Sequence, residues 1–272
     1  MQRAKQIPPY VKVAAAGCLL AAGGFVAMHV DTVPQTGRKR LMFLSRETER
    51  RIGEQTFQDV LALHKGHILP PSHPKSKMVT RVGRRIAKVA GQDDFQWEFA
   101  VIDSPDANAF CVPGGKVCVF TGLFKTLRHE DGLAAVLGHE IAHAVARHSA
   151  EQMSMSALLL LGLLFLPTGS IQVARLAFTL GVDLPFSRMH ELEADAIGLD
   201  LMAKACYDPR ASPQMFADWE KQHLGTTVKY LSTHPPNTER SSLLRNQLKE
   251  PLAYFQKHCH DVRTNFGQIV AR

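Results

Sequence analysis

The stretch VLGHEIAHAVARH, residues 136–148, decides the fold that we expect for this chain. Its apolar residues recur at the spacing of an α-helix, and neither proline nor glycine interrupts it after the third position. Two residues four apart project from the same face of a helix, so His139 and His143 can hold one metal ion together. Glu140 follows His139 directly, within reach of a water molecule on that ion.

These residues form the arrangement H-E-x-x-H, in which two imidazoles bind zinc and the glutamate takes a proton from the metal-bound water. The motif is short, and the alternative is a surface helix that happens to be rich in histidine. A catalytic zinc ion takes three protein ligands and keeps an open position for water. His148 follows His143 at one residue less than the metzincin spacing, so we expect it around the site or at the surface rather than on the metal.

The third ligand is expected from a second helical pattern, SRMHELEADAIGLDLMAKA, residues 187–205. Glu191 and Asp195 stand four apart on one face of that helix, with small residues beside them that would let a neighbouring helix approach. We predict that Glu191 binds the metal and that Asp195 accepts the free ring N–H of a ligand histidine. The alternative is that these acids are solvated on an amphipathic helix, and for Glu193 and Asp200 we adopt that interpretation.

The order HEIAH at 139–143 and ELEAD at 191–195 resembles the gluzincin metallopeptidases that include HtpX and the CAAX prenyl proteases. NAFCVPGGKVCVFTGL at 108–123 is similar to the hairpin that precedes the active-site helix of that family, and STHPPNTER at 232–240 to its C-terminal His-Pro motif. Longer stretches are similar to the Oma-type peptidases of the mitochondrial inner membrane: residues 30–45, 185–199, 203–212 and 230–235.

Together these motifs predict a zinc endopeptidase with one Zn²⁺ per chain and protein or peptide substrates. His139, His143 and Glu191 would hold the ion, and Glu140 would act as the general base. The resemblance also implies that His234 and Arg240 belong to the active site without binding metal, because matching positions in the family contact substrate. An ordinary turn and helix cap is the alternative for these two residues.

We expect an extended substrate to add as a strand along the edge 116–120, because backbone pairing gives affinity with little sequence demand. That suits a quality-control protease acting on misfolded or regulated membrane proteins. The candidate substrate-binding residues are Asn108, Gly115, Lys116, Val117, Cys118 and Val119.

The fold class expected for the 272 residues is α+β, a mostly helical zincin-type domain with a small antiparallel sheet. Helices are predicted at 45–64 and 77–90, a strand at 95–103 and a hairpin at 108–120, with helices almost to the end. The five cysteines show no CxxC pair, which argues against a cysteine zinc site and a disulfide framework. Cys111 and Cys118 could face each other across the hairpin, and we expect both to be buried thiols.

The net charge of +7 is not accompanied by a nucleic-acid-binding motif, so we expect no nucleic acid partner. Basic residues gather just after the first apolar segment, where they would meet anionic lipid headgroups. A solvated helix face is the alternative, because Glu47 and Glu49 lie among them. The basic residues are Arg38, Lys39, Arg40, Arg46, Arg50 and Arg51. Membrane lipid is therefore an expected partner, and a homo-oligomer is left open.

The apolar segment 13–30 carries no formal charge and is just long enough to span a bilayer. We predict a short basic segment at 1–12, a transmembrane anchor at 13–30 and a metallopeptidase domain at 31–272. A cleaved signal peptide is the alternative to the anchor. A second apolar region, 155–182, is predicted as a hairpin that lies in the core or dips into the membrane.

The expected location is the mitochondrial inner membrane, with the catalytic domain in the intermembrane space. Two alternatives stay open. One is a bacterial envelope relative that acts in outer-membrane protein quality control, and the other is an inert zinc-binding scaffold.

Overall fold

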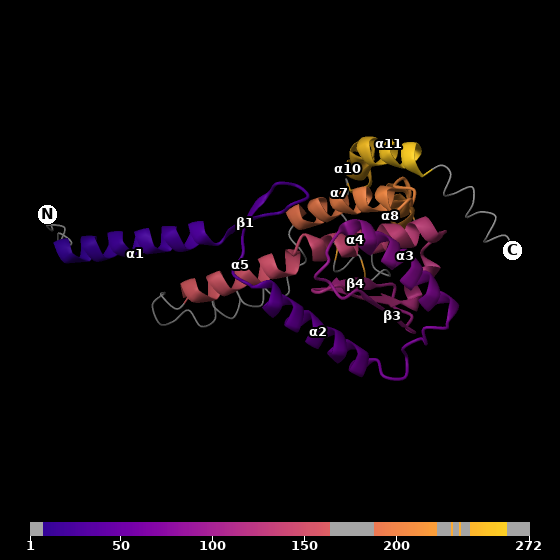
Figure 1. Cartoon of the computed structure of the whole chain (residues 1–272), viewed down its shortest axis with the longest axis horizontal. Helices are drawn as coiled ribbons and strands as arrows, with labels where there is room; N and C mark the ends of the chain where they lie inside the picture. Colours follow the sequence, from indigo (N-terminus) through magenta and orange to yellow (C-terminus); the bar gives the residue numbers. More distant parts are fainter. Residues whose placement is uncertain (1–7, 164–187, 222–229, 231–233, 235–239, 260–272) are drawn as a thin grey trace.

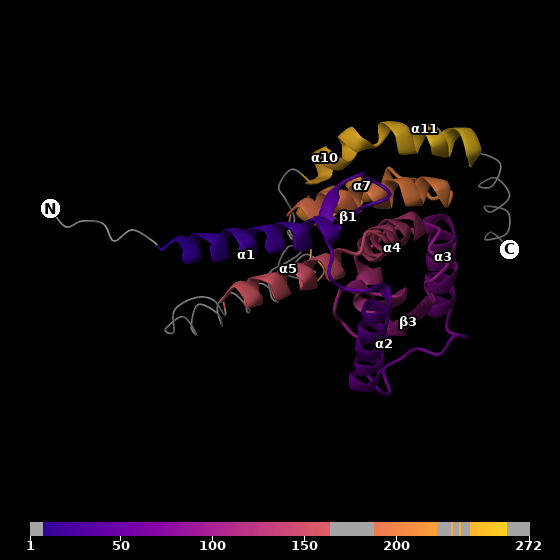
Figure 2. The same cartoon turned by 60° about the vertical axis from the view of Figure 1, so that its left-hand side comes forward.

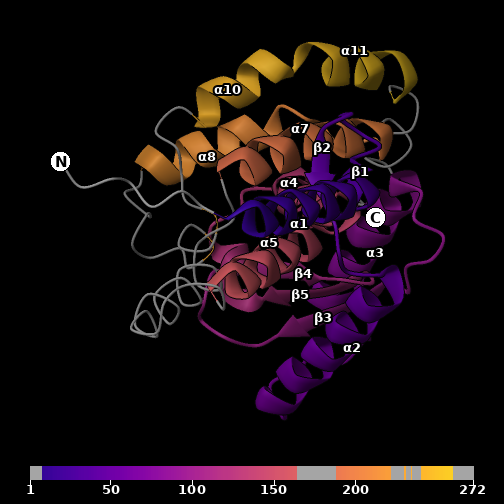
Figure 3. The same cartoon turned by 90° about the vertical axis from the view of Figure 1, so that its left-hand side faces the viewer.

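The computed structural model of the chain describes residues 8–163, 188–221, 230, 234 and 240–259. Within them the chain is mostly helical with little sheet, which confirms the α+β class. Helix α1 (Pro9–Met28) and the far part of α5 (His148–Leu163) extend away from the body of the protein on the same side, as Figures 1 and 2 show. The body is layered: α10 and α11 lie over α7 and α8, then α4, then the sheet, then α2 (Figure 3).

Helix α4 (Glu130–Val145) carries the H-E-x-x-H motif through the middle of the protein. Every residue from Gly132 onward is buried, because α3 (Pro74–Ala90), α7 (Arg188–Lys204) and strand β4 (Ala109–Val112) pack around it. A helix covered on all sides tolerates polar residues only where they find partners. The histidines of α4 therefore need partners within the protein.

The crossing of α4 and α7 depends on two glycines that face each other. A Cβ on Gly198 would lie 3.1 Å from the backbone nitrogen of His139, and one on Gly138 would lie 3.2 Å from the carbonyl oxygen of Gly198. Such contacts are tighter than side chains ordinarily tolerate, so the missing Cβ atoms let the two backbones meet. The close approach expected from the small residues of this helix is confirmed, and it brings the acids of α7 to the histidines of α4.

The predicted strand and hairpin are confirmed as β3 (Glu98–Ile102), β4 and β5 (Lys116–Phe120). The order is β3-β5-β4: β4 pairs antiparallel with β5, whereas β3 pairs parallel with it, so this three-stranded sheet is mixed. The expectation that 116–120 offers a free edge is wrong, because β5 is the central strand and pairs on both sides. Its five residues are all buried, as in a strand covered on both faces.

The predicted helix 45–64 is α2 (Arg46–Leu63), and its first turn is capped by the Ser45 hydroxyl, which accepts a hydrogen bond from the Thr48 N–H at 3.1 Å. Between α1 and α2 the chain forms a second, two-stranded antiparallel sheet from β1 (Val30–Thr32) and β2 (Lys39–Leu41). We call residues 30–41 the N-terminal hairpin. The remaining elements are the 3-10 helix η1 (Thr121–Lys125) and the helices α8 (Ala211–Lys221), α10 (Arg240–Gln247) and α11 (Lys249–His258).

The predicted membrane anchor falls within α1, a helix of 20 residues. Among the helices that the structure describes, none combines the length and the apolar character needed to cross a bilayer. The anchor therefore stays a prediction. The apolar region 155–182 begins in α5, and its larger part lies outside the described residues.

One disulfide bond, which joins Cys206 and Cys259, was not foreseen by the argument against a disulfide framework. The bond ties the end of α7 to the end of α11, and the two cysteines are 53 residues apart, so no local spacing could reveal it. Cys111 and Cys118 are free thiols, as predicted. Cys118 is buried and Cys111 is half-buried. Cys118 pairs with Phe110 and Cys111 with Val117, so the two cysteines lie diagonally across the hairpin and do not face each other.

Candidate metal centre and active site

Four buried side chains converge between α4 and α7: His139, His143, Glu191 and His234, with ligand-type atoms all within 4.8 Å of one another. The Nε2 atoms of His139 and His143 lie 3.0 Å apart, and each lies 3.3 Å from a different carboxylate oxygen of Glu191. The first three are the ligands predicted from the sequence. His143 and Glu191, on different helices, are 48 positions apart in the chain.

This group of donors fits a zinc ion. Tetrahedral zinc with bonds of about 2.0–2.1 Å holds its ligand atoms roughly 3.3 Å from one another, close to the spacing of the two imidazole nitrogens and the carboxylate. Two buried carboxylate oxygens, Glu140 Oε1 and Glu191 Oε2, make no hydrogen bond among the described residues, although Glu191 Oε2 lies 3.2 Å from a guanidinium nitrogen of Arg240 in an ion pair. Buried carboxylate oxygens ordinarily find a partner, so a cation and a water molecule would complete what the protein leaves open.

Two of the proposed ligands, Glu191 and His143, are in the protonation states that suit a bound cation. Burial raises the pKa of Glu191, but His139, His143 and His234 outweigh it and hold the pKa of Glu191 far below its usual value, so the carboxylate is ionised. Burial lowers the pKa of His143 well below its usual value, which keeps this imidazole neutral. A neutral imidazole and an ionised carboxylate are the forms in which these side chains bind zinc.

Asp195 lies against the other nitrogen of His139, with Nδ1 and Oδ1 2.9 Å apart. Arg240 in turn binds Asp195 through Nε at 2.9 Å and through its second terminal nitrogen at 2.7 Å. The same guanidinium lies 3.2 Å from Glu191 and stacks over the ring of Phe216. Arg240 is therefore a buried partner of two carboxylates, placed at the site as expected but turned toward the acids of α7.

His234 lies inside the cluster. Its Nδ1 is 3.0 Å from Glu191 Oε1, and its Nε2 is 3.4 Å from Glu140 Oε1. The ring thus bridges the carboxylate of the ligand group and the carboxylate expected to act as the base. Tyr230, which sequence reasoning gave no role, stacks on His234 with ring centroids 4.6 Å apart. Burial and the charge of Glu140 raise the pKa of the Tyr230 phenol. The signal in the sequence that could have placed Tyr230 beside His234 is the spacing of four residues between them.

The predicted substrate-binding residues do not form a free strand edge beside the metal cluster. Val117, Cys118 and Val119 lie in the central strand, and the Lys116 ammonium pairs with Glu98 and Glu54. The other two predicted residues, Gly115 and Asn108, have structural roles. Gly115 has a positive φ of 89°, and a Cβ there would lie 3.0 Å from the Trp97 ring, while the side chain of Asn108 accepts a hydrogen bond from the Ala109 N–H.

One further histidine, His148, and two further acids, Glu193 and Asp200, were also considered in the sequence analysis, and only Glu193 differs from its expectation. Glu193, expected to be solvated, is buried, and its carboxylate binds His148 and Arg38. That expectation is wrong because the face of α7 opposite Glu191 is covered by the N-terminal hairpin and by α5. His148 is fully buried with its Nδ1 2.8 Å from His143 Nδ1, so it lies around the site, as one of the two expectations held. Asp200 is half-exposed and pairs with Lys204.

Known proteins resemble the chain over most of its length. Residues 73–248 match the family model described as Peptidase family M48. The chain is 39% identical over 244 residues to the mitochondrial metalloendopeptidase OMA1 of Schizosaccharomyces pombe, covering 86% of this chain and 71% of that protein. It is 35% identical to the OMA1 protein of Saccharomyces cerevisiae, covering 92% and 77%. The beta-barrel assembly-enhancing protease of Yersinia pestis is 31% identical, over 64% of this chain and 39% of that protein.

A metallopeptidase is thus the class that both the buried cluster and the relatives define. The chain belongs to peptidase family M48 and is a metalloendopeptidase, which confirms the resemblance drawn from the motifs.

Proposed function

We propose that the metal is a single zinc ion held by His139, His143 and Glu191, and that Glu140 is the general base. The observation that carries this proposal is the buried Glu140 Oε1, which has no hydrogen-bond partner among the described residues and lies beside the ligand group. When bound, zinc lowers the pKa of a water molecule to about 7 and polarises the scissile carbonyl. Glu140 takes the proton of the attacking water and later delivers it to the leaving amine.

His234 supplies a donor for the oxyanion that develops when water attacks. Glu191 accepts a hydrogen bond from Nδ1 of this ring, and a ring that carries a proton on each nitrogen also donates from Nε2, on the side of Glu140. A donor fixed in a buried site stabilises developing charge without reorganising, and removing one such donor costs about 10²–10³ in turnover. Tyr230 holds the ring plane by stacking, and Arg240 neutralises Asp195 and part of Glu191.

The substrate pairs with β4 rather than with β5. β4 is the outer strand of the three-stranded sheet in the described residues and packs against α4. The negative charge of Glu140 reaches Cys111 of this strand, where burial first and that charge second raise the pKa of the thiol. An extended peptide on β4 would therefore pass beside the base, held by its backbone and so with little demand on sequence.

We also propose that the protein works in mitochondria, on proteins of the inner membrane, with α1 as its membrane attachment and the catalytic domain in the intermembrane space. The OMA1 relatives, mitochondrial by name, cover more of the chain than the Yersinia pestis protease does, which favours this location over a bacterial envelope. The presence of Glu140 beside the ligand group speaks against an inert zinc scaffold.

The test is to measure zinc content and casein or fluorogenic-peptide cleavage in the wild type and Glu140→Gln side by side. We expect one zinc per chain in both proteins and cleavage only in the wild type. Wild-type cleavage by Glu140→Gln, or a wild type without zinc, would refute the chemistry. For the location, a fluorescent fusion should reach mitochondria and resist alkaline carbonate extraction; a soluble or non-mitochondrial fusion would contradict it.

A further inference from the structure

The two histidines of the H-E-x-x-H motif have different partners behind them. Nδ1 of His139 faces a carboxylate, that of Asp195. Nδ1 of His143 faces another imidazole, the Nδ1 of His148 at 2.8 Å, and the Nε2 of His148 lies 3.0 Å from Glu193 Oε2. His148 and Glu193 are both buried, so water does not substitute for these bonds.

The position of one proton decides whether His143 can bind a metal. The two facing Nδ1 atoms need one donor and one acceptor, because two N–H groups would repel and two lone pairs would make no bond. His143 can offer the lone pair of Nε2 only if it carries its proton on Nδ1. His148 must then accept at Nδ1 and carry its own proton on Nε2, from which it donates to Glu193.

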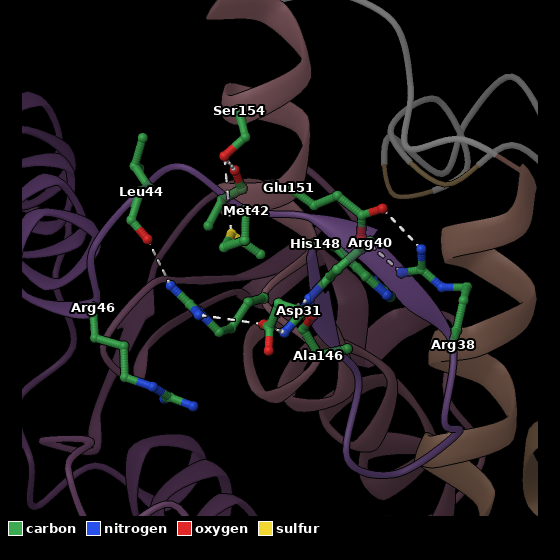
Figure 4. Close-up of polar contacts among 12 residues, drawn as sticks. Asp31, Arg38, Arg40, Met42, Leu44, Arg46, Ala146, His148, Glu151 and Ser154 are labelled. Atoms are coloured by element: carbon green, nitrogen blue, oxygen red, sulfur yellow. Dashed lines mark hydrogen bonds and ion pairs between the residues drawn. The ribbon is translucent and has the colours of Figure 1, made fainter. Parts of the chain in front are cut away.

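The N-terminal hairpin holds Glu193 in place. Arg38 donates from Nε to Glu193 Oε2 at 2.8 Å, and Thr36 donates to the other oxygen. The remaining nitrogens of Arg38 grip Glu151 of α5 at 2.8 and 2.7 Å. Figure 4 shows Arg38 turned toward Glu151, with His148 beside them. The hairpin directly follows α1, so the segment next to the proposed membrane attachment reaches to within two side chains of a metal ligand.

The backbone before His148 is shaped for this contact. Arg147, between α4 and α5, has a φ of 56°, a left-handed conformation that non-glycine residues seldom adopt. The turn lets His148 fold back onto His143, and the Arg147 guanidinium is fixed by Glu49 at 2.7 Å and by the Leu44 carbonyl at 3.0 Å. An unfavourable backbone conformation that many contacts maintain is a recurrent feature of functional sites.

We propose that His148, Glu193 and Arg38 form a positioning relay that fixes His143 in its metal-binding tautomer and that the N-terminal hairpin completes. The relay rests on the proposed function, since it requires that His143 bind the metal. None of its three members touches the metal or the substrate. They are positioning residues, and their loss shows first in metal affinity.

The experiment measures zinc affinity of the metal-free full-length chain by competition with a chromophoric chelator. Removing a group that orients a ligand typically weakens metal binding 10–100-fold, and we expect this for His148→Phe and for Glu193→Ala. His148→Asn is the rescuing variant, because its amide oxygen can accept from His143 without depending on a tautomer. Asp200→Ala, at a half-exposed acid of the same helix, is the matched control and should bind zinc as the wild type does.

The decisive comparison is Glu193→Ala in the two backgrounds. In the His148→Asn background, Glu193→Ala should weaken zinc binding less than about threefold, because the amide of residue 148 does not need Glu193 to fix the position of a ring proton. Equal weakening in both backgrounds would show a merely structural role, and no weakening in either would also overturn the relay. If Glu193→Ala does not fold, Arg38→Gln at the more exposed end takes its place, with the same loss and the same rescue expected.

A spectroscopic readout tests the proton directly. Long-range ¹H–¹⁵N spectra of the zinc-loaded chain should place the His148 proton on Nε2, and a proton on Nδ1 would contradict the relay. A wild type that binds no zinc would sink the proposed function and the relay together. A wild type that binds zinc while His148→Phe binds it equally well would sink the relay alone.

Discussion

Replacing Arg240 by methionine removes the cation that lies between two buried acids. The guanidinium is 2% exposed, donates twice to Asp195 at 2.9 and 2.7 Å, and lies 3.2 Å from Glu191. Methionine fills much of the same space and can keep the contact with Phe216. The substitution therefore changes mainly the charge, and it leaves two carboxylates buried with less compensation.

The expected loss of stability follows from that burial. Removing one partner of a buried ion pair costs about 3–5 kcal/mol, because the other charge stays in a poorly solvated place. For a domain of this size that corresponds to a fall in Tm of roughly 6–20 °C. A matched control is Arg210→Met. Arg210 grips Asp208 at 2.6 Å in a similar two-pronged way, but its side chain is 59% exposed, and pairs of that kind contribute about 0–1 kcal/mol.

The assay is thermal and urea unfolding of the metal-free chain, followed by circular dichroism. Zinc should reduce the loss in Arg240→Met, because Glu191 then has the ion as a cationic partner. An Arg240→Met protein within about 1 kcal/mol of the wild type, or no more affected than Arg210→Met, would refute the reasoning from burial.

Three further outcomes are expected. Glu191→Ala should lose zinc and activity, as measured by bound metal and peptide cleavage; stoichiometric zinc in the variant would contradict the ligand assignment. His234→Ala should keep zinc and fold yet turn over about 10²–10³ times more slowly, and wild-type kcat would refute the oxyanion role. In the wild type, burial raises the pKa of Glu151, but Arg38 and His190 outweigh it and lower the pKa from 4.5 to about 2. The stabilisation by Glu151 is therefore complete above pH 4.5 and is lost as pH falls through about 2. Glu151→Gln should be less stable than the wild type by about 3 kcal/mol at pH 7, and its free energy of unfolding, measured by urea titration, should fall less steeply between pH 4.5 and 2. An unchanged dependence on pH in that range would contradict the prediction.

Local periodicity was enough to place the candidate metal ligands. His139 and His143 share a face because they are four residues apart on one helix, and Glu191 and Asp195 do so for the same reason. The strand and the hairpin were equally predictable, since alternation and the Pro-Gly-Gly turn are short-range signals. The class of enzyme followed from these motifs, and its membership of peptidase family M48 agrees with them.

Strand order and the disulfide were decided by the tertiary structure. The parallel pairing of β3 with β5 joins residues across the intervening β4, so no turn specifies it, and this pairing takes away the edge that the hairpin alone would leave. The bond between Cys206 and Cys259 likewise depends on where α11 packs against α7.

Glu193 shows most clearly where the sequence stops. At about 100° per residue, a position two residues after Glu191 points to the opposite side of the helix, so the pattern correctly removes Glu193 from the metal-binding face. Periodicity reports which residues share a face, but it does not report what covers the other one. The hairpin that covers it brings Arg38 across 155 positions of sequence, a contact that only the packing of the whole chain creates. Periodicity along the chain was enough to predict the proposed ligands and the proposed base, whereas the groups that lie behind them follow from the tertiary structure, because long-range packing buries both faces of α7.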